Sequence, residues 1–178
     1  MNFQWFTDGS SSGMQKGQIK RAGWAAVVPN LNGKQYIRYG YIPEGTNNMG
    51  ELTGPLYVLK TFHQKKDWKI EIISDSQYFI NSITKWRHNW KLNNYVGIAN
   101  RELIMDISKY YDIHGHIKLT WVKGHKGNIG NELADKWAGK GKMEIIVSIK
   151  NDKQDIQFVP YDLVTPRRLN GNYSQKER

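Results

Sequence analysis

Residues 23–28 read GWAAVV and residues 35–42 read QYIRYGYI, and they follow an aromatic-rich stretch, FQWFT, at residues 3–7. Apolar, aromatic and β-branched runs of this length, separated by Gly/Ser and Asn-Gly breaks, are typical of strands. The sequence therefore predicts three consecutive strands that pair antiparallel.

The rest of the chain alternates between helical and strand-like patterns. Leu52, Leu56 and Leu59 recur at helical spacing, although the Gly54-Pro55 pair should kink that helix. Further along we expect a strand at 70–74, a helix at 77–90, a helix with a buried stripe between 99 and 110, a strand at 116–122 and a closing helix at 131–140. This order predicts an α/β fold with a mixed sheet and crossover helices.

Composition narrows the chemistry that is available. A length of 178 residues suits one compact domain, and the absence of cysteine excludes disulfides, thiolate zinc sites and a cysteine nucleophile. A formal net charge of +10 would attract polyanions, or it could serve solubility alone.

Residues 1–8 lack the features of a secretory signal, and no apolar run approaches the length of a membrane span. We therefore expect an intracellular protein, cytoplasmic or at the nucleoid or nucleus, without a membrane partner.

Four acidic residues, Asp8, Glu51, Asp75 and Asp135, lie near predicted strand ends or in predicted helices. If the two strands are neighbours and the helices pack over their ends, the four carboxylates converge. Clustered carboxylates repel one another and are tolerated where they share a proton or hold cations. Hard oxygen ligands in this number suit a pair of Mg²⁺ or Mn²⁺ ions. Each acid could instead be a surface residue or a helix cap, and spacing alone does not separate these alternatives.

Five short motifs surround these acids. They are Thr7-Asp8-Gly9-Ser10, Thr46-Asn47-Asn48-Met49-Gly50-Glu51-Leu52, Ser74-Asp75-Ser76-Gln77-Tyr78, Ile83-Thr84-Lys85-Trp86-Arg87-His88-Asn89-Trp90-Lys91, and Trp121-Val122-Lys123-Gly124-His125 with its continuation Asn131-Glu132-Leu133-Ala134-Asp135. In their order and spacing, over roughly residues 3–142, they closely resemble the motifs of type 1 ribonuclease H.

The resemblance implies a ribonuclease H-like fold: a five-stranded mixed sheet, three antiparallel strands followed by parallel ones, with helices on both faces. It also implies an endonuclease that hydrolyses the RNA strand of RNA/DNA hybrids with two Mg²⁺ ions, replaceable by Mn²⁺, and leaves 3′-hydroxyl and 5′-phosphate ends. Asp8 would bridge the ions, and Glu51, Asp75 and Asp135 would complete their ligand shells. His125, in a loop rich in glycine and lysine, would move protons or assist product release; the alternative is an ordinary exposed histidine.

Recognition of a hybrid requires contacts to the 2′-hydroxyl, and amide side chains can both donate to it and accept from it. The resemblance implies that Asn47 and Asn48 make such contacts and that Lys85–Lys91 begins a basic protrusion that grips the DNA strand. Trp86 would rest against deoxyribose, although Trp86 and Trp90 could instead be a core-packing pair. The residues predicted to bind substrate are Gly9, Ser10, Thr46, Asn47, Asn48, Gln77, Lys85, Trp86, Asn89, Trp90, Lys91, Asn100 and Lys123.

Two other functions remain open as alternatives. The chain could be a catalytically silent module that binds hybrid or RNA, or another nuclease of the same superfold that acts on DNA. Metal-free cleavage by a histidine pair ranks below both, because no second histidine occupies a loop like that of His125. We expect a monomer without a small-molecule cofactor.

All matched motifs end before Met143, so the sequence predicts a catalytic domain at residues 1–142 and a C-terminal extension at residues 143–178. The extension carries two weak strand signals, at 145–149 and 156–159, and could consist of packed strands or a flexible tail.

Overall fold

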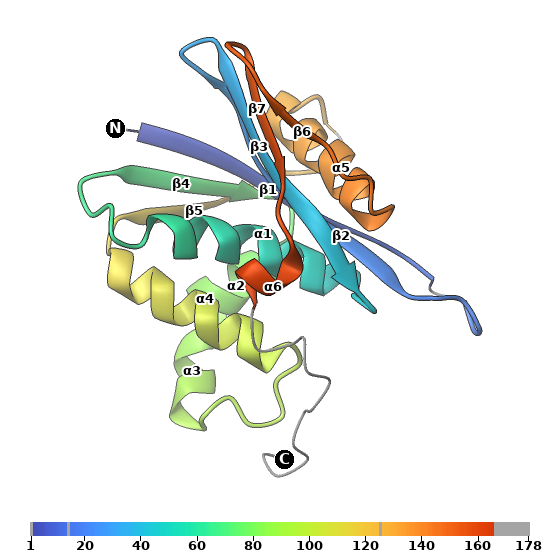
Figure 1. Cartoon of the computed structure of the whole chain (residues 1–178). Coiled ribbons are helices and arrows are strands. Elements are labelled where there is room, and N and C mark those ends of the chain that lie inside the picture. The colour runs from blue at the N-terminus through green and yellow to red at the C-terminus, as the bar shows by residue number, and fades with distance from the viewer. Residues whose placement is uncertain (1, 14, 125, 166–178) are drawn as a thin grey trace.

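The computed structural model describes residues 2–13, 15–124 and 126–165. Within these residues the strands form a single mixed sheet in the spatial order β5-β4-β1-β2-β3-β7-β6, and helices lie against both of its faces (Figure 1). The α/β class predicted from the sequence is confirmed. The strands are β1 (Asn2–Ser12), β2 (Arg21–Leu31), β3 (Lys34–Pro43), β4 (Lys69–Ser74), β5 (Ile117–Trp121), β6 (Ser148–Lys150) and β7 (Gln154–Phe158).

The expected antiparallel meander is present in β1, β2 and β3, and β4 and β5 follow in parallel pairing with β1 and with each other. The expectation of five strands is wrong, because the described part of the chain places seven strands in the sheet. The two additional strands come from the C-terminal extension. β7 pairs parallel with Gln35–Tyr39 of β3, and β6 pairs antiparallel with β7.

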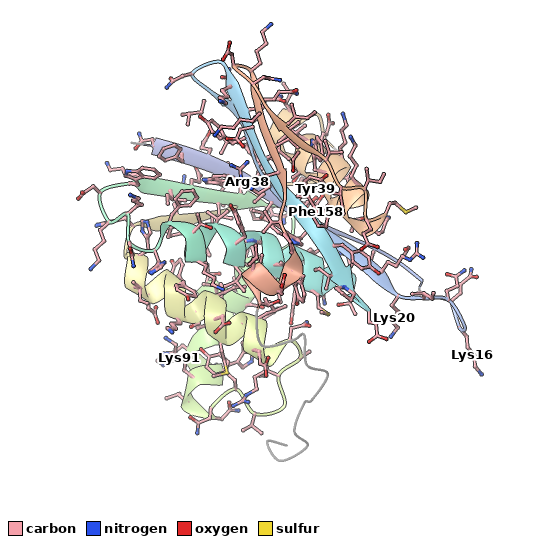
Figure 2. All side chains as sticks on the ribbon, viewed as in Figure 1. Lys16, Lys20, Arg38, Tyr39, Lys91 and Phe158 are labelled. Carbon is pink, nitrogen blue, oxygen red and sulfur yellow. The ribbon has the colours of Figure 1, made fainter. Side chains whose placement is uncertain are left out.

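Side-chain contacts fasten the extension to β3. Arg38 forms an ion pair of 2.9 Å with Asp155, and the rings of Tyr39 and Phe158 meet edge to face at 5.5 Å between centroids. Figure 2 shows Arg38, Tyr39 and Phe158 at the place where β3 meets β7. The buried Tyr39 hydroxyl donates to the carbonyl oxygen of Ile145 at 2.7 Å, so the link from α5 into β6 is held as well.

Two hydrophobic layers lie on opposite faces of the sheet. On one face α1 (Asn47–Phe62) packs against β1 and β2, and α4 (Arg101–His114) packs against α1. Leu52, Leu56 and Leu59 are fully buried there, which confirms the predicted helical stripe, and Pro55 lies inside α1 without ending it. On the other face α5 (Ile129–Lys142) covers β1, β2 and β3 through Ala134, Trp137 and Ala138.

Shorter elements complete the fold. α2 (Gln77–Asn81), a π-helical turn (Ser82–Trp86) and α3 (Arg87–Leu92) occupy the region for which one helix was expected. After β7, α6 (Tyr161–Val164) contacts α1, and Lys60 of α1 donates to the carbonyl oxygen of Val164 at 3.0 Å. Within the described ranges, the helices are too short or too polar for any of them to cross a membrane.

Candidate active site

The parallel pairing of β1 with β4 brings the first two acids together. Its register ends at Thr7 opposite Ser74, so the next residue on each strand is an aspartate, Asp8 and Asp75. Because both strands run in the same direction, these two side chains emerge at the same edge of the paired region. β1 itself continues to Ser12 along β2, so Asp8 lies within the strand and not at its end.

Asp8 is the most deeply buried acid of the group, with only 7% of its surface exposed. Burial is the main reason why its pKa is raised from 3.8 to about 8, and repulsion from Asp75, Asp135 and Glu51 adds to the shift. The backbone N–H of Gly9 donates to Asp8 Oδ1 at 2.7 Å and works in the opposite direction. Asp8 therefore lies at the centre of a carboxylate cluster, a name we use for Asp8, Glu51, Asp75 and Asp135.

Glu51 reaches Asp8 because the first turns of α1 lie directly on the sheet. A β-carbon on Gly9 would lie 2.3 Å from the backbone nitrogen of Glu51, and one on Gly50 would lie 2.4 Å from the carbonyl oxygen of Gly23. Glycines at these two contacts let helix and strand backbones approach more closely than side chains would permit. Any larger residue would push Glu51 away from the strand that carries Asp8.

Two neutral donors hold the Glu51 carboxylate. Asn47 Nδ2 donates to Oε1 at 2.7 Å, and the hydroxyl of Ser76 donates to Oε2. Burial raises the pKa of Glu51, the Ser76 and Asn47 hydrogen bonds oppose this rise, and the charge of Asp75 adds to it. The result is a carboxylate with a fixed direction in a region of high negative charge.

Asp75 lies directly after β4 and is held from α5. Asn131 Nδ2 donates to Asp75 Oδ2 at 3.1 Å, and Trp121 Nε1 donates to the Asp75 carbonyl oxygen at 3.0 Å. Gly124 lies so close that a β-carbon on it would meet Asp75 Oδ2 at 2.4 Å. Asp135 follows Asn131 by four residues on α5, so it lies on the same face of that helix and is exposed to solvent.

The donor chemistry of this cluster fits hard divalent cations. Glu51, Asp75 and Asp135 all oppose the ionisation of the buried Asp8, and clustered carboxylates are stabilised by bound cations. Within the described residues, however, no three His, Asp or Glu side chains lie close enough to share one ion. The carboxylates of Glu51 and Asp75 instead accept hydrogen bonds from neutral donors. His125, the fifth predicted catalytic residue, lies outside the described residues.

The other residues predicted to bind substrate fall into two groups around the cluster. Near the start of α1, Thr46 caps the helix by accepting from the Met49 N–H at 3.3 Å, while Asn47 holds Glu51. Asn100 directly precedes α4 and donates to the Tyr78 hydroxyl at 3.3 Å. Asn48, Gln77 and Lys123 are exposed, Ser10 is half-buried, and Gly9 is buried beneath α1.

The second group is the predicted protrusion, Lys85–Lys91, in the π-helical turn and α3. Lys85 and Asn89 are exposed, and the ring of Trp86 is 39% exposed. Trp90 is half-buried against the core that α1 and α4 form, with its ring 5.6 Å from that of Trp86. The core-packing alternative therefore describes Trp90, while Trp86 offers an aromatic surface to solvent.

Sequence reasoning did not assign roles to Ser76 and Asn131. Both belong to quoted motifs, but their importance depends on which way their side chains point. Ser76 also caps α2 by accepting from the Phe79 N–H, and Asn131 is 1% exposed. Their short distance in sequence from Asp75 and Asp135 was the available signal, because small polar residues beside a carboxylate often orient it.

The sheet order, the two helical layers and the carboxylates at the end of the β1–β4 pairing define a nuclease of the ribonuclease H-like class. The RNase H family model matches residues 1–143, and the chain belongs to this family. It is accordingly a nuclease that hydrolyses phosphodiester bonds. β6, β7 and α6 lie beyond the matched residues.

Relatives and solved structures agree with this assignment. Ribonuclease H of Orientia tsutsugamushi (strain Boryong) is 36% identical over 142 residues, which are 77% of this chain and 82% of the relative. The fold resembles that of LC9-RNase H1, a type 1 RNase H with the type 2 active-site motif, with a TM-score of 0.64 and 22% identity over 80% of this chain and 72% of that one. It also resembles the foamy viral protease-reverse transcriptase solved with an RNA/DNA hybrid, with a TM-score of 0.62 and 19% identity over 79% of this chain and 20% of that one.

Proposed function

We propose that this chain is an endoribonuclease that hydrolyses the RNA strand of RNA/DNA hybrids with two divalent cations, and that it leaves 3′-hydroxyl and 5′-phosphate ends. The observation that carries the proposal is the carboxylate cluster around Asp8, whose pKa is raised mainly by burial and further by the charges of Asp75, Asp135 and Glu51. Such a cluster is suited to holding cations against a phosphodiester.

In this proposal Asp8, Glu51, Asp75 and Asp135 would hold two Mg²⁺ ions, with Mn²⁺ as a substitute. When bound, the cations supply a hydroxide nucleophile from water and neutralise the leaving oxygen. The chain itself directs the carboxylates. Asn47 and Ser76 fix the direction of Glu51, and Asn131 fixes that of Asp75.

Recognition of the hybrid is assigned to surfaces on both sides of the cluster. We assign Asn47 and Asn48, in the first turn of α1, to contacts with a 2′-hydroxyl next to Glu51, since amides can donate and accept. Lys85 and Lys91 would contact phosphates of the DNA strand, and the exposed ring of Trp86 would lie against deoxyribose. The foamy viral structure, which shares the fold, was solved with an RNA/DNA hybrid and supports this choice of substrate.

The role of His125 is part of the proposal. We assign it to proton transfer or product release, because the cations can form the nucleophile without it. Exchange for alanine should slow turnover by roughly 10² to 10⁴, the contribution typical of a positioned acid or base, without abolishing cleavage.

A cleavage panel tests the proposed function. Labelled RNA/DNA hybrid, RNA duplex, DNA duplex and single-stranded RNA are incubated with the full chain in Mg²⁺, in Mn²⁺ or in chelator, and the ends of the products are mapped. We expect cleavage of the hybrid alone, in either metal, and none in chelator. Asp75→Asn is the matched control, since it keeps the shape of the side chain and should bind hybrid without cutting it.

The same panel separates the rival functions. Hybrid binding by the wild type without cleavage under any metal condition would indicate a silent binding module. Equal cleavage of the DNA duplex would indicate another nuclease of the superfold. Cleavage that persists in chelator would overturn the metal-dependent mechanism itself.

A further inference from the structure

One carboxylate outside the active site holds two cations of the protrusion. Asp112, near the end of α4, accepts from Arg87 at its Oδ1 and from Lys91 at its Oδ2, the latter at 2.5 Å. Arg87 and Lys91 are four residues apart and therefore lie on the same face of α3. The Asp112 side chain thus takes the place that a phosphate group would take between these two cations.

The two cations are held to different degrees. The Arg87 guanidinium also lies over the ring of Tyr111, 4.9 Å from its centroid, and the side chain is 21% exposed. Lys91 has its ion pair with Asp112, and its side chain is 43% exposed. Lys91 extends from α3 on the side of the molecule away from the β6 edge (Figure 2). Arg87 therefore anchors Asp112, and Lys91 is the cation that can turn away to another anion.

We propose that Asp112 is an internal competitor for Lys91, so that a phosphate of the nucleic acid gains Lys91 only by displacing the Asp112 carboxylate. The inference rests on the proposed function, because it takes Lys91 as part of the hybrid-binding surface. Asp112 is a positioning residue here: it sets how much of the positive charge of α3 is available to substrate, and it touches no reacting atom.

The competition is easily reversed, because exposed ion pairs contribute little net free energy in water. A phosphodiester carries the same charge as the carboxylate and brings further contacts along the strand, so it can win the exchange. Lys85, by contrast, is exposed, and the described residues offer it no acidic partner within ion-pair distance. Among the described residues Lys85 thus has no acid to leave before it can bind substrate, whereas Lys91 has to be released from Asp112 first.

The test exchanges Asp112 for asparagine, which keeps the shape and removes the charge. Kd is measured for a short RNA/DNA hybrid in chelator, which prevents cleavage, with the full chain and over a range of salt concentrations. We expect Asp112→Asn to bind about 2- to 5-fold more tightly at low salt, an amount in keeping with exposed ion pairs. The salt dependence should steepen by about one released counterion. In Mg²⁺, KM should fall while kcat does not rise.

Two further variants show whether the effect is local. Asp106→Asn removes the same charge from the same helix, at a position where the described residues provide no ion pair, and it should change Kd by less than about 2-fold. In a Lys91→Gln background, Asp112→Asn should lose most of its effect. If Asp106→Asn tightened binding as much as Asp112→Asn, or if Asp112→Asn kept its full effect in the Lys91→Gln background, the effect would come from net charge alone. Either result would overturn the proposal.

Failure of the inference is distinct from failure of the proposed function. If the wild type binds and cleaves hybrid while Asp112→Asn binds no more tightly, the competition is refuted and the nuclease assignment stands. If the wild type binds no hybrid at any salt concentration, both are refuted together. Thermal unfolding of each variant verifies that a changed Kd does not arise from unfolding.

Discussion

The side-chain amide of Asn131 donates a hydrogen bond of 3.1 Å to Asp75 Oδ2 and so joins the first turn of α5 to the end of β4. Asn131 Oδ1 is buried without a hydrogen-bond partner among the described residues, so the Nδ2 contact alone decides how the amide is turned. One helix thus supplies both Asp135 and the group that directs Asp75. The position of α5 on the sheet therefore controls half of the carboxylate cluster.

Exchange of Asn131 for alanine should reduce the rate of cleavage without unfolding the protein. A hydrogen bond to a charged group contributes about 1.5–3 kcal/mol, so we expect kcat to fall roughly 10- to 100-fold and the Mg²⁺ concentration for half-maximal rate to rise. Glu132→Gln, at the exposed neighbouring position, is the control and should change neither. A wild-type kcat in Asn131→Ala at a temperature where it is folded would exclude the positioning role.

Asp8→Asn should abolish cleavage and at the same time stabilise the metal-free protein. The variant replaces a carboxyl group that ionises freely in the unfolded chain but not in the folded protein, where burial and the charges of Asp75, Asp135 and Glu51 oppose its ionisation. At neutral pH the free energy of unfolding should rise by ~1 kcal/mol or more, which raises Tm by about 2–4 °C for each kcal/mol in a chain of this size. Asp67→Asn, at an exposed position, should leave Tm within a degree or so of the wild type.

The pH dependence of this effect has a defined sign. Because the pKa of Asp8 is raised from 3.8 to about 8, the folded protein retains a proton that the unfolded chain releases. The contribution to stability is full below pH 3.8 and is lost as pH rises to about 8. In chelator, the Tm of the wild type should therefore fall relative to that of Asp8→Asn as pH rises from 3.8 to about 8. Addition of Mg²⁺ should raise the Tm of the wild type more than that of Asp8→Asn. Parallel curves of Tm against pH for the two proteins would contradict a raised pKa of Asp8 in the folded protein.

The C-terminal extension should contribute to stability through Ile156, which faces Ile149 across the β6–β7 pair. Ile156 is 4% exposed and Ile149 is 40% exposed, so the two are matched in type and differ in burial. Ile156→Ala should cost about 2–4 kcal/mol in denaturant unfolding, and Ile149→Ala less than about 1 kcal/mol. Equal effects would show that the extension adds no buried core.

Removal of residues 143–178 tests the predicted domain boundary directly. The four residues of the carboxylate cluster all precede residue 143, so cleavage should persist wherever the truncated chain is folded. We expect a lower Tm, because Ile156, Val159 and Val164 leave the core. A truncated chain that is folded by circular dichroism but does not cleave would make the extension part of the active site.

His114 should make the protein less stable in mild acid. Burial is the main cause that lowers its pKa, with repulsion from His116 and His63 adding to it. The unfolded chain therefore takes up a proton first, and the contribution to stability is full above the ordinary value near 6.5 and is lost as pH falls below it. Denaturant midpoints between pH 7.5 and 5.5 should fall more steeply for the wild type than for His114→Gln. His88→Gln, exposed on α3, should follow the wild type.

The positions of Asp8 and Asp75 could be predicted from the sequence because they depend on one local rule. Both residues follow the last paired position of neighbouring parallel strands, and strand patterns are visible in a single chain. The orientation of Asp75 was not predictable in this way. It depends on Asn131, 56 residues further along the chain, and on how closely α5 approaches the sheet.

Other contacts escaped prediction for related physical reasons. The weak strand signal at 156–159 overlaps β7, but one buried apolar side chain, Ile156, within five residues does not indicate that this strand pairs with β3. The pairing of Lys91 with Asp112 joins two residues that are 21 positions apart and lie on different helices, and no periodic pattern encodes which exposed charges meet. The pattern of apolar residues in a sequence therefore indicates which elements form the layers. The polar contacts between layers are visible only in the folded structure.

The pairing of β7 with β3 also affects how the protein behaves in concentrated solution. Without the extension, residues 35–39 of β3 would present an open row of backbone N–H and C=O groups at the edge of the sheet. Such rows recruit strands from other molecules and begin aggregation. With the extension in place the boundary strand is β6, which has three residues, including a lysine. A boundary that short and charged offers little to a second chain, so the two C-terminal strands protect the nuclease against self-association into extended sheets.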